Sequence, residues 1–192
     1  LSASLATGDT VRVYDGSTFL GSATVSGTTW TYVDTRTLTN AQAVTYTVRV
    51  ADAAVNEGTA SAAYTATVDT QAPTTTGTVT AITDDAGLLQ GTVTSGSTTD
   101  DTRLALSGTL SASLAAGDTV RVYDGSTFLG SATVSGTTWT YVDTRTLTNA
   151  QAVSYTVRVA DAAVNEGTAS AAYTATVDTV APTTTGTVTA IT

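Results

Sequence analysis

The residues of this sequence that could do chemistry are aspartates, gathered in pairs and near turns. Asp84 and Asp85 end one predicted strand, Asp100 and Asp101 precede the next, and a Gly- and Thr-rich loop joins the two pairs. Adjacent carboxylates repel each other, so two such pairs held close by one loop favour a compensating cation. Calcium is the natural candidate, because it takes about six to eight oxygen ligands from loop carboxylates and backbone carbonyls.

Four further aspartates stand at the ends of predicted elements. Asp69 and Asp178 lie shortly before an Ala-Pro pair, and Asp52 and Asp161 open the turn between the last two predicted strands. The candidate calcium ligands are therefore Asp52, Asp69, Asp84, Asp85, Asp100, Asp101, Asp161 and Asp178. Aspartate is also common in turns that bind no metal, and that alternative stays open for all of them.

The other aspartates have simpler interpretations. Turn residues that bind no metal are expected at Asp9, Asp15, Asp118 and Asp124. Asp34 and Asp143 are expected to pair with Arg36 and Arg145 on a sheet surface, where such ion pairs contribute little to stability.

The sequence lacks most of the side chains that enzymes use. It has 192 residues and a net charge of −9, with 16 carboxylates, seven cationic side chains that are all Arg, and no His or Cys. Without His, Cys or Lys, no Ser or Thr has a conventional activating base, and the usual zinc ligands are missing. A carboxylate pair could serve a glycosidase, but duplicated whole domains are poorly suited to building one cleft, so we expect no enzyme.

The same composition bears on partners. The excess of carboxylates argues against nucleic acid as a partner, because affinity for phosphate backbones needs clustered cations. No apolar run is long enough to cross a bilayer, so we expect no membrane insertion.

An internal repeat organises the chain. The segment that begins at Leu1 returns at Leu110, a spacing of 109 residues, and residues 1–83 differ from residues 110–192 at three positions. A period of this length matches a whole domain and is too long for a solenoid coil or a propeller blade. We expect a repeat without its first strand and loop at 1–71, a complete repeat at 72–180 and the first strand of another at 181–192.

The complete repeat predicts about seven short strands with alternating apolar residues. Val153, Tyr155, Val157 and Val159 alternate with polar residues. Asp124-Gly125 is a hairpin signal, and after it Phe128, Ala132 and Val134 are expected to face the core. Thr supplies 48 residues, a composition typical of strands and turns. The sequence predicts an all-β, two-sheet β-sandwich, with the Trp side chains at positions 30 and 139 in the cores.

In a sandwich, the loop after the first strand and the last hairpin turn lie at opposite poles. Head-to-tail stacking of repeats would bring Asp69 near Asp161 of the following repeat. The pairs Asp84-Asp85 and Asp100-Asp101 would lie near Asp178. We therefore expect calcium at the joints, where it would stiffen the array.

The motifs VDTVAPTTTGTVTAIT from Val177, TDDTRLALSGTL from Thr99 and VRVADAAVNEG from Val157 resemble a known family, as does DTVRVYDGSTFLGSATV from Asp118. They resemble the bacterial immunoglobulin-like tandem repeats of giant type I-secreted adhesins, of the repeats-in-toxin and biofilm-associated kind. The resemblance implies immunoglobulin-like sandwiches in tandem, a location outside the cell on the bacterial surface, and calcium as cofactor. It also implies a spacer role in adhesion or biofilm formation, with neighbouring repeats of the chain as partners.

The sequence departs from that family at ADAAVNEG, where the family usually has a Gly before the Asn. Val55 and Val164 occupy that position, which weakens the case for Asn56 and Asn165 as ligands.

The sequence also bears on two other functions and one further partner. Each repeat could itself bind a glycan or a protein, which clustered exposed aromatics would support. Ice binding is disfavoured, because Thr76, Thr78 and Thr80 form no short-period ladder. We also expect residues 183–192, the counterpart of an opening strand, to pair with residues 1–70 of another copy, because an exposed edge invites strand addition.

Overall fold

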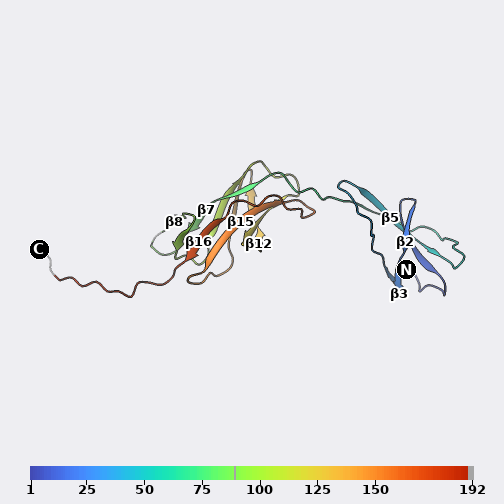
Figure 1. Cartoon of the computed structure of the whole chain (residues 1–192), viewed down its shortest axis with the longest axis horizontal. Helices are drawn as coiled ribbons and strands as arrows, with labels where there is room; N and C mark the ends of the chain where they lie inside the picture. Colours follow the sequence, from blue (N-terminus) through green and yellow to red (C-terminus); the bar gives the residue numbers. More distant parts are fainter. Residues whose placement is uncertain (89, 190–192) are drawn as a thin grey trace. The chain divides into compact units, whose positions relative to one another are not determined.

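The computed structural model describes residues 1–88 and 90–189 and builds them from β-strands alone, so the predicted all-β class is confirmed. The chain divides into two compact units, Leu1–Gln71 and Ala72–Thr192 (Figure 1). Within the described residues, no helix could cross a membrane.

The second unit has two five-stranded sheets. The first sheet has the order β13-β14-β10-β7-β8, with β13 at Thr133–Ser135, β14 at Thr138–Val142, β10 at Ala105–Leu110, β7 at Gly77–Asp84 and β8 at Gly91–Val93. The second has the order β12-β11-β15-β16-β9, with β12 at Thr127–Ser131, β11 at Thr119–Asp124, β15 at Ala152–Ala160, β16 at Tyr173–Val177 and β9 at Ser97–Thr99. All neighbours pair antiparallel except β16 and β9, which are parallel.

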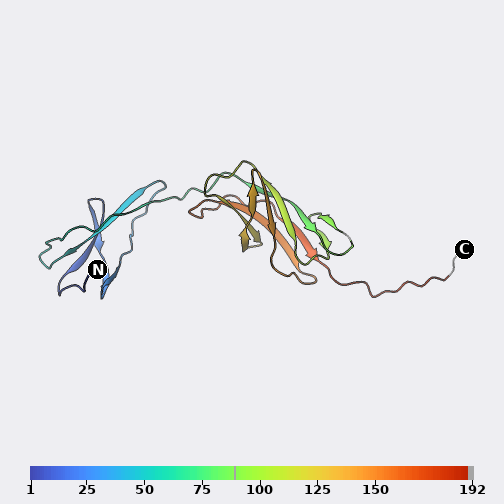
Figure 2. The same cartoon turned by 180° about the vertical axis from the view of Figure 1, so that it is seen from behind.

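One apolar core joins these sheets into a β-sandwich, and Figure 2 shows them from behind. Ile82 and Leu106 from the first sheet, and Leu104 just before β10, pack with Val120 and Val157 from the second. The alternation in β15 places Val153, Tyr155, Val157 and Val159 inward, as period-2 patterning requires. Trp139 is 1% exposed, which confirms its predicted place in the core.

Two features of the second unit differ from the sequence interpretation. The stretch between Asp85 and Asp100, predicted as a loop, contains β8 and β9, whose three residues each are too short to show a period. Phe128, expected to face inward, is 44% exposed because a register shift between Val122 and Tyr123 changes the facing of β12.

The first unit contains counterparts of β11–β16 only. A four-stranded sheet has the order β2-β1-β5-β6, with β2 at Thr18–Ser22, β1 at Thr10–Asp15, β5 at Ala43–Ala51 and β6 at Tyr64–Thr67. A separate two-stranded sheet pairs β3, Thr24–Ser26, with β4, Thr29–Thr31. This unit has no counterpart of β7 or β10, and Trp30, predicted to be a core residue, is 37% exposed.

Candidate functional site at one pole of the second unit

Two buried carboxylates stand at the pole of the second unit where β7 and β16 end. Asp84 is the last residue of β7 and is 6% exposed, and Asp101 follows β9 and is 3% exposed. Neither forms an ion pair with any described Arg. Burying a charge is costly unless it is paired, so these two groups suit a site for a cation.

Hydrogen bonds hold these two carboxylates in place. Asp84 accepts bonds from the Thr99 hydroxyl at 2.6 Å and from the Ala86 backbone N–H at 3.0 Å. Asp101 accepts from the Arg103 N–H at 2.7 Å and the Asp85 N–H at 3.4 Å. A hydrogen bond from the Asp85 N–H to the Asp101 carboxylate therefore links the two pairs, Asp84-Asp85 and Asp100-Asp101.

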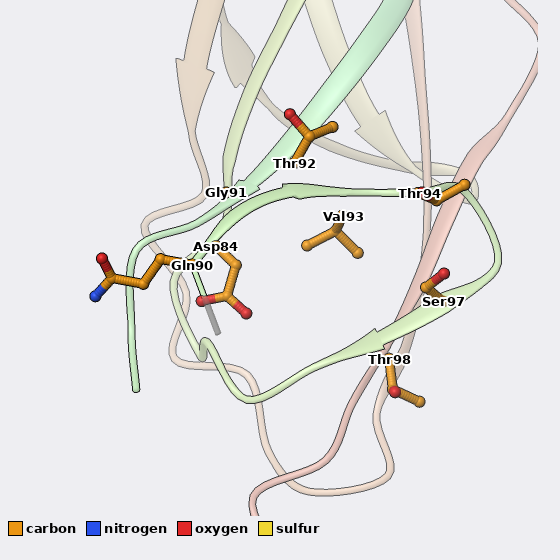
Figure 3. Close-up of a pocket in the computed structure, with 8 residues that line it drawn as sticks. All are labelled: Asp84, Gln90, Gly91, Thr92, Val93, Thr94, Ser97 and Thr98. Carbon is orange, nitrogen blue, oxygen red and sulfur yellow. The ribbon is translucent and has the colours of Figure 1, made fainter. Parts of the chain in front are cut away.

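Asp178 joins this pole from the other end of the unit's sequence. Its backbone N–H donates to the Thr99 carbonyl at 2.8 Å, and one pocket is lined by Asp84, Asp100 and Asp178 together. A neighbouring pocket, seen in Figure 3, lies inside the turn of chain from β8 to β9; there the Asp84 carboxylate points inward beside Val93, and the Gln90 amide points away. Asp85, Asp100 and Asp178 are exposed to solvent.

This pole offers candidate ligands but not a formed coordination shell. Calcium prefers carboxylate and carbonyl oxygens, which is the donor set present. Within residues 1–88 and 90–189, however, no group of three or more acidic side chains converges closely enough to hold a metal ion.

Asp161 lies at the opposite pole, where β15 ends, and there it organises a turn. Its carboxylate accepts from the Asn165 backbone N–H at 2.8 Å and from the Asn165 side-chain amide at 2.9 Å, which together lower the pKa of Asp161. Asp52 and Asn56 repeat this arrangement at 2.8 Å for both bonds. These carboxylates therefore have local partners, as a turn-forming aspartate does.

The residues before Asn56 and Asn165 adopt a backbone conformation that favours Gly. Val164 has φ +66° and Val55 has φ +65°, a left-handed conformation that a β-branched residue rarely adopts. The turn therefore has a left-handed residue at this position although the residue is Val and not Gly.

Each of the two linker aspartates accepts a hydrogen bond from the backbone N–H two residues further along the chain. Asp69 accepts from the Gln71 N–H at 3.0 Å, and Asp178 accepts from the Val180 N–H at 3.1 Å. Asp69 belongs to the first unit and Asp161 to the second. Their predicted approach therefore stays a prediction.

One prediction about the acidic residues was wrong. Asp143 was expected on a sheet surface with Arg145, but it is 0% exposed. It does pair with Arg145, at 2.6 Å, and it accepts a bond from the buried Tyr155 hydroxyl at 2.7 Å. The sequence does not reveal this burial, because it depends on a contact with a distant segment. The Asp143 N–H donates a hydrogen bond to the Leu104 carbonyl.

Asp124 also does more than form a turn. It accepts from the Ser154 N–H at 2.8 Å and from Arg145 at 2.9 Å, and so joins the hairpin to β15.

A cluster of Arg and aromatic side chains on the outer face of the second sheet was not predicted. Arg121 stacks over Phe128 at 4.0 Å, and Glu166 bridges Arg121 at 2.8 Å and Arg158 at 3.5 Å. Arg121 and Arg158 face each other in the register of β11 and β15, so Glu166 neutralises a like-charge pair. This internal pairing gives the exposed Phe128 a structural role.

In comparisons with known proteins, no family model matched the chain and no curated protein matched it. The resemblance to adhesin repeats therefore depends on the sequence motifs alone.

Proposed function

We propose that this chain is a spacer segment of a large bacterial surface adhesin, made of immunoglobulin-like sandwiches in series and stiffened by calcium where one repeat joins the next. The proposed location is outside the cell, and the proposed role is to support adhesion or biofilm formation. The observation that carries the calcium part is the burial of Asp84 and Asp101 without a cationic partner at a pole that also holds Asp178.

The duplicated sequence supports the spacer part. Two near-identical copies in one chain provide length and repetition. The described residues also lack His and Cys, and most of the Asp, Glu and Arg side chains serve turns and ion pairs within each unit. A molecule whose charged side chains are engaged in its own turns and ion pairs is better suited to a spacer role than to catalysis.

The candidate ligands suggest how an ion would act. Asp84 ends β7, Asp100 and Asp101 precede β10, and Asp178 begins the segment that leaves the unit. An ion bound by these oxygens would cross-link the pole to the outgoing chain. At ten times its Kd, each such independent site would add about 1.4 kcal/mol of stability.

Calcium titration of the chelator-treated protein tests this proposal. We expect the thermal midpoint of the second unit to rise with calcium and small-angle scattering to report a more extended chain. Asp84→Asn and Asp178→Asn should each weaken the rise. Asp118→Asn, which removes a partly exposed carboxylate near the start of β11, should not.

Sodium chloride at matched ionic strength is the second control, because simple screening of a −9 chain would also stabilise it. If sodium chloride gave the same rise as calcium, or if neither the midpoint nor the scattering responded to calcium, the calcium-stiffened spacer would be rejected.

A further inference from the structure

The outer face of the sheet that contains β11 and β15 carries a concentration of positive charge. We call the group Arg121, Tyr123, Phe128, Arg158 and Glu166 the arginine patch. Arg121 and Arg158 lie directly opposite each other in the register of the two strands, and Glu166 contacts them at 2.8 Å and 3.5 Å. One carboxylate cancels only one of two guanidinium charges, so the patch keeps a net positive charge.

The first unit contains the same patch. Its members are Arg12, Tyr14, Phe19, Arg49 and Glu57, and Glu57 contacts the two Arg side chains at the same 2.8 Å and 3.5 Å. Four of the seven Arg residues of the chain therefore belong to the two patches. On a chain with a net charge of −9, such a patch attracts an anion that most of the surface would repel.

The two Arg side chains of a patch differ in how they are engaged. Arg121 contacts the Tyr123 hydroxyl at 3.0 Å and Glu166 at 2.8 Å, both through Nε. Arg158 is 43% exposed, and within residues 1–88 and 90–189 its guanidinium forms only the 3.5 Å ion pair and a distant contact with the Tyr123 ring. Its planar fork of N–H donors is therefore open to a ligand, and a carboxylate matches that fork with two parallel hydrogen bonds.

An exposed aromatic ring adjoins these guanidinium groups. Phe128 is 44% exposed, and its counterpart Phe19 is 43% exposed. Arg121 stacks over the Phe128 ring at 4.0 Å, and the Tyr123 ring lies 5.5 Å from it, so the ring is held in place with part of its surface free. The C–H groups of a sugar ring can pack against such a surface.

We infer that each arginine patch is a binding site for an acidic glycan. The carboxylate of one sugar would accept hydrogen bonds from Arg158, and the apolar side of the glycan would pack on Phe128. This inference is independent of the calcium proposed at the pole, because it uses different residues and a different part of the unit.

Other anionic ligands fit the patch less well. A nucleic acid needs several clustered cations, and the two Arg charges here are partly cancelled by Glu166. An acidic peptide could supply the carboxylate, but a flexible peptide loses more conformational entropy on binding than a rigid sugar ring does. A patch that recurs in each repeat would also suit a polysaccharide, since repeated weak contacts along one polymer add up.

The test is a titration of the isotope-labelled full chain with a trimer of galacturonic acid, followed by NMR. We expect amide shifts in β11 and β15 of the second unit and in β1 and β5 of the first, with similar affinities in both. The fully methyl-esterified trimer has the same sugar rings without the charge and should cause no shifts. The result should be the same with and without calcium.

Arg158→Gln should weaken binding in the second unit at least tenfold and leave the first unit unchanged as an internal reference. An unchanged Trp139 indole signal would show that the second unit of this variant is still folded. Arg103→Gln, which removes the same charge from an exposed residue outside both patches, should leave both sites intact.

Four results would overturn the inference: no shifts with the original chain, equal binding of the methyl ester, unchanged second-unit binding in Arg158→Gln, or loss of binding in Arg103→Gln. A trimer of glutamate that bound as tightly as the sugar would also overturn it, because the site would then recognise acidic peptides.

Discussion

At the scale of single residues, Val55 and Val164 are strained because their backbones lie in the left-handed region. Val164 has φ +66° in the turn after β15, a conformation that costs a β-branched residue on the order of 1–3 kcal/mol. We expect Val164→Gly to stabilise the second unit by about 1 kcal/mol, because Gly relieves the strain while adding unfolded-state entropy. Urea denaturation would measure the change.

Ala163→Gly is the matched control for this substitution. Ala163 is a neighbouring exposed residue outside the left-handed region, so a Gly there adds only unfolded-state entropy and should destabilise slightly. Equal effects of the two substitutions would mean that Val164 is not strained.

The buried Asp143 predicts how stability depends on pH. Burial alone would raise the pKa of its carboxyl, but hydrogen bonds from Arg145 and Tyr155 outweigh burial and hold the pKa below the ordinary value. A carboxyl with a lowered folded pKa stabilises the protein above its unfolded pKa of about 4, and this contribution is lost as the pH falls through the folded pKa. We therefore expect the second unit to lose stability below about pH 4.

Asp143→Asn tests this dependence. At neutral pH it should cost about 3 kcal/mol, because it leaves Arg145 and Asp124 without the central carboxylate of a buried network. It should also make the thermal midpoint of the second unit depend less on pH below about pH 4. Asp34→Asn, at the partly exposed counterpart position, should cost less, since water can replace the lost contacts. Equal costs at both positions would contradict the role given to burial.

At the scale of elements, Gly108 is where β10, β7 and β14 meet most closely. A Cβ at this position would clash with the Thr78 backbone oxygen and the Trp139 ring. We expect Gly108→Ala to destabilise the second unit by about 3 kcal/mol, because backbone cannot move aside as a flexible side chain can. Gly186→Ala, which would meet nothing within 4 Å, should be neutral in the same thermal assay. A neutral Gly108→Ala would show that β7 and β10 are not fixed by this contact.

The elements also show which parts of the fold were predictable. The alternation of Val153, Tyr155, Val157 and Val159 predicted β15 correctly, because a strand of nine residues gives a clear period. β8 and β9 were missed because three residues give none. Phe128 was misplaced because a bulge changes which residues face inward, and no residue pattern marks that bulge.

The candidate site was predictable to a similar degree. The sequence correctly grouped Asp84, Asp101 and Asp178 at one pole, because strand order in a sandwich dictates which loops share an end. It could not reveal that Asp143 is buried, since that depends on tertiary contact with β10. The sequence left open whether Asp161 binds calcium or only forms a turn. In the structure, its carboxylate accepts a hydrogen bond from the Asn165 backbone in the same turn.

At the scale of the whole molecule, the two units should differ in stability although their shared sequence is nearly identical. The first unit leaves Trp30 37% exposed, whereas the second buries Trp139 to 1%. Leaving about a third of a Trp side chain exposed costs about 1–2 kcal/mol, so we expect the first unit to unfold first and by at least about that margin. A two-unit chain of this kind should show two transitions rather than one.

Hydrogen exchange read by mass spectrometry can follow both units in one experiment. β5 and β15 are matched strands that differ only at Thr45 and Ser154, so their peptides have different masses. Amides in β5 should exchange faster than those in β15, because the unit that contains β5 leaves more of its apolar side chains exposed. Equal exchange in β5 and β15 would show that the exposure of Trp30 does not weaken the first unit.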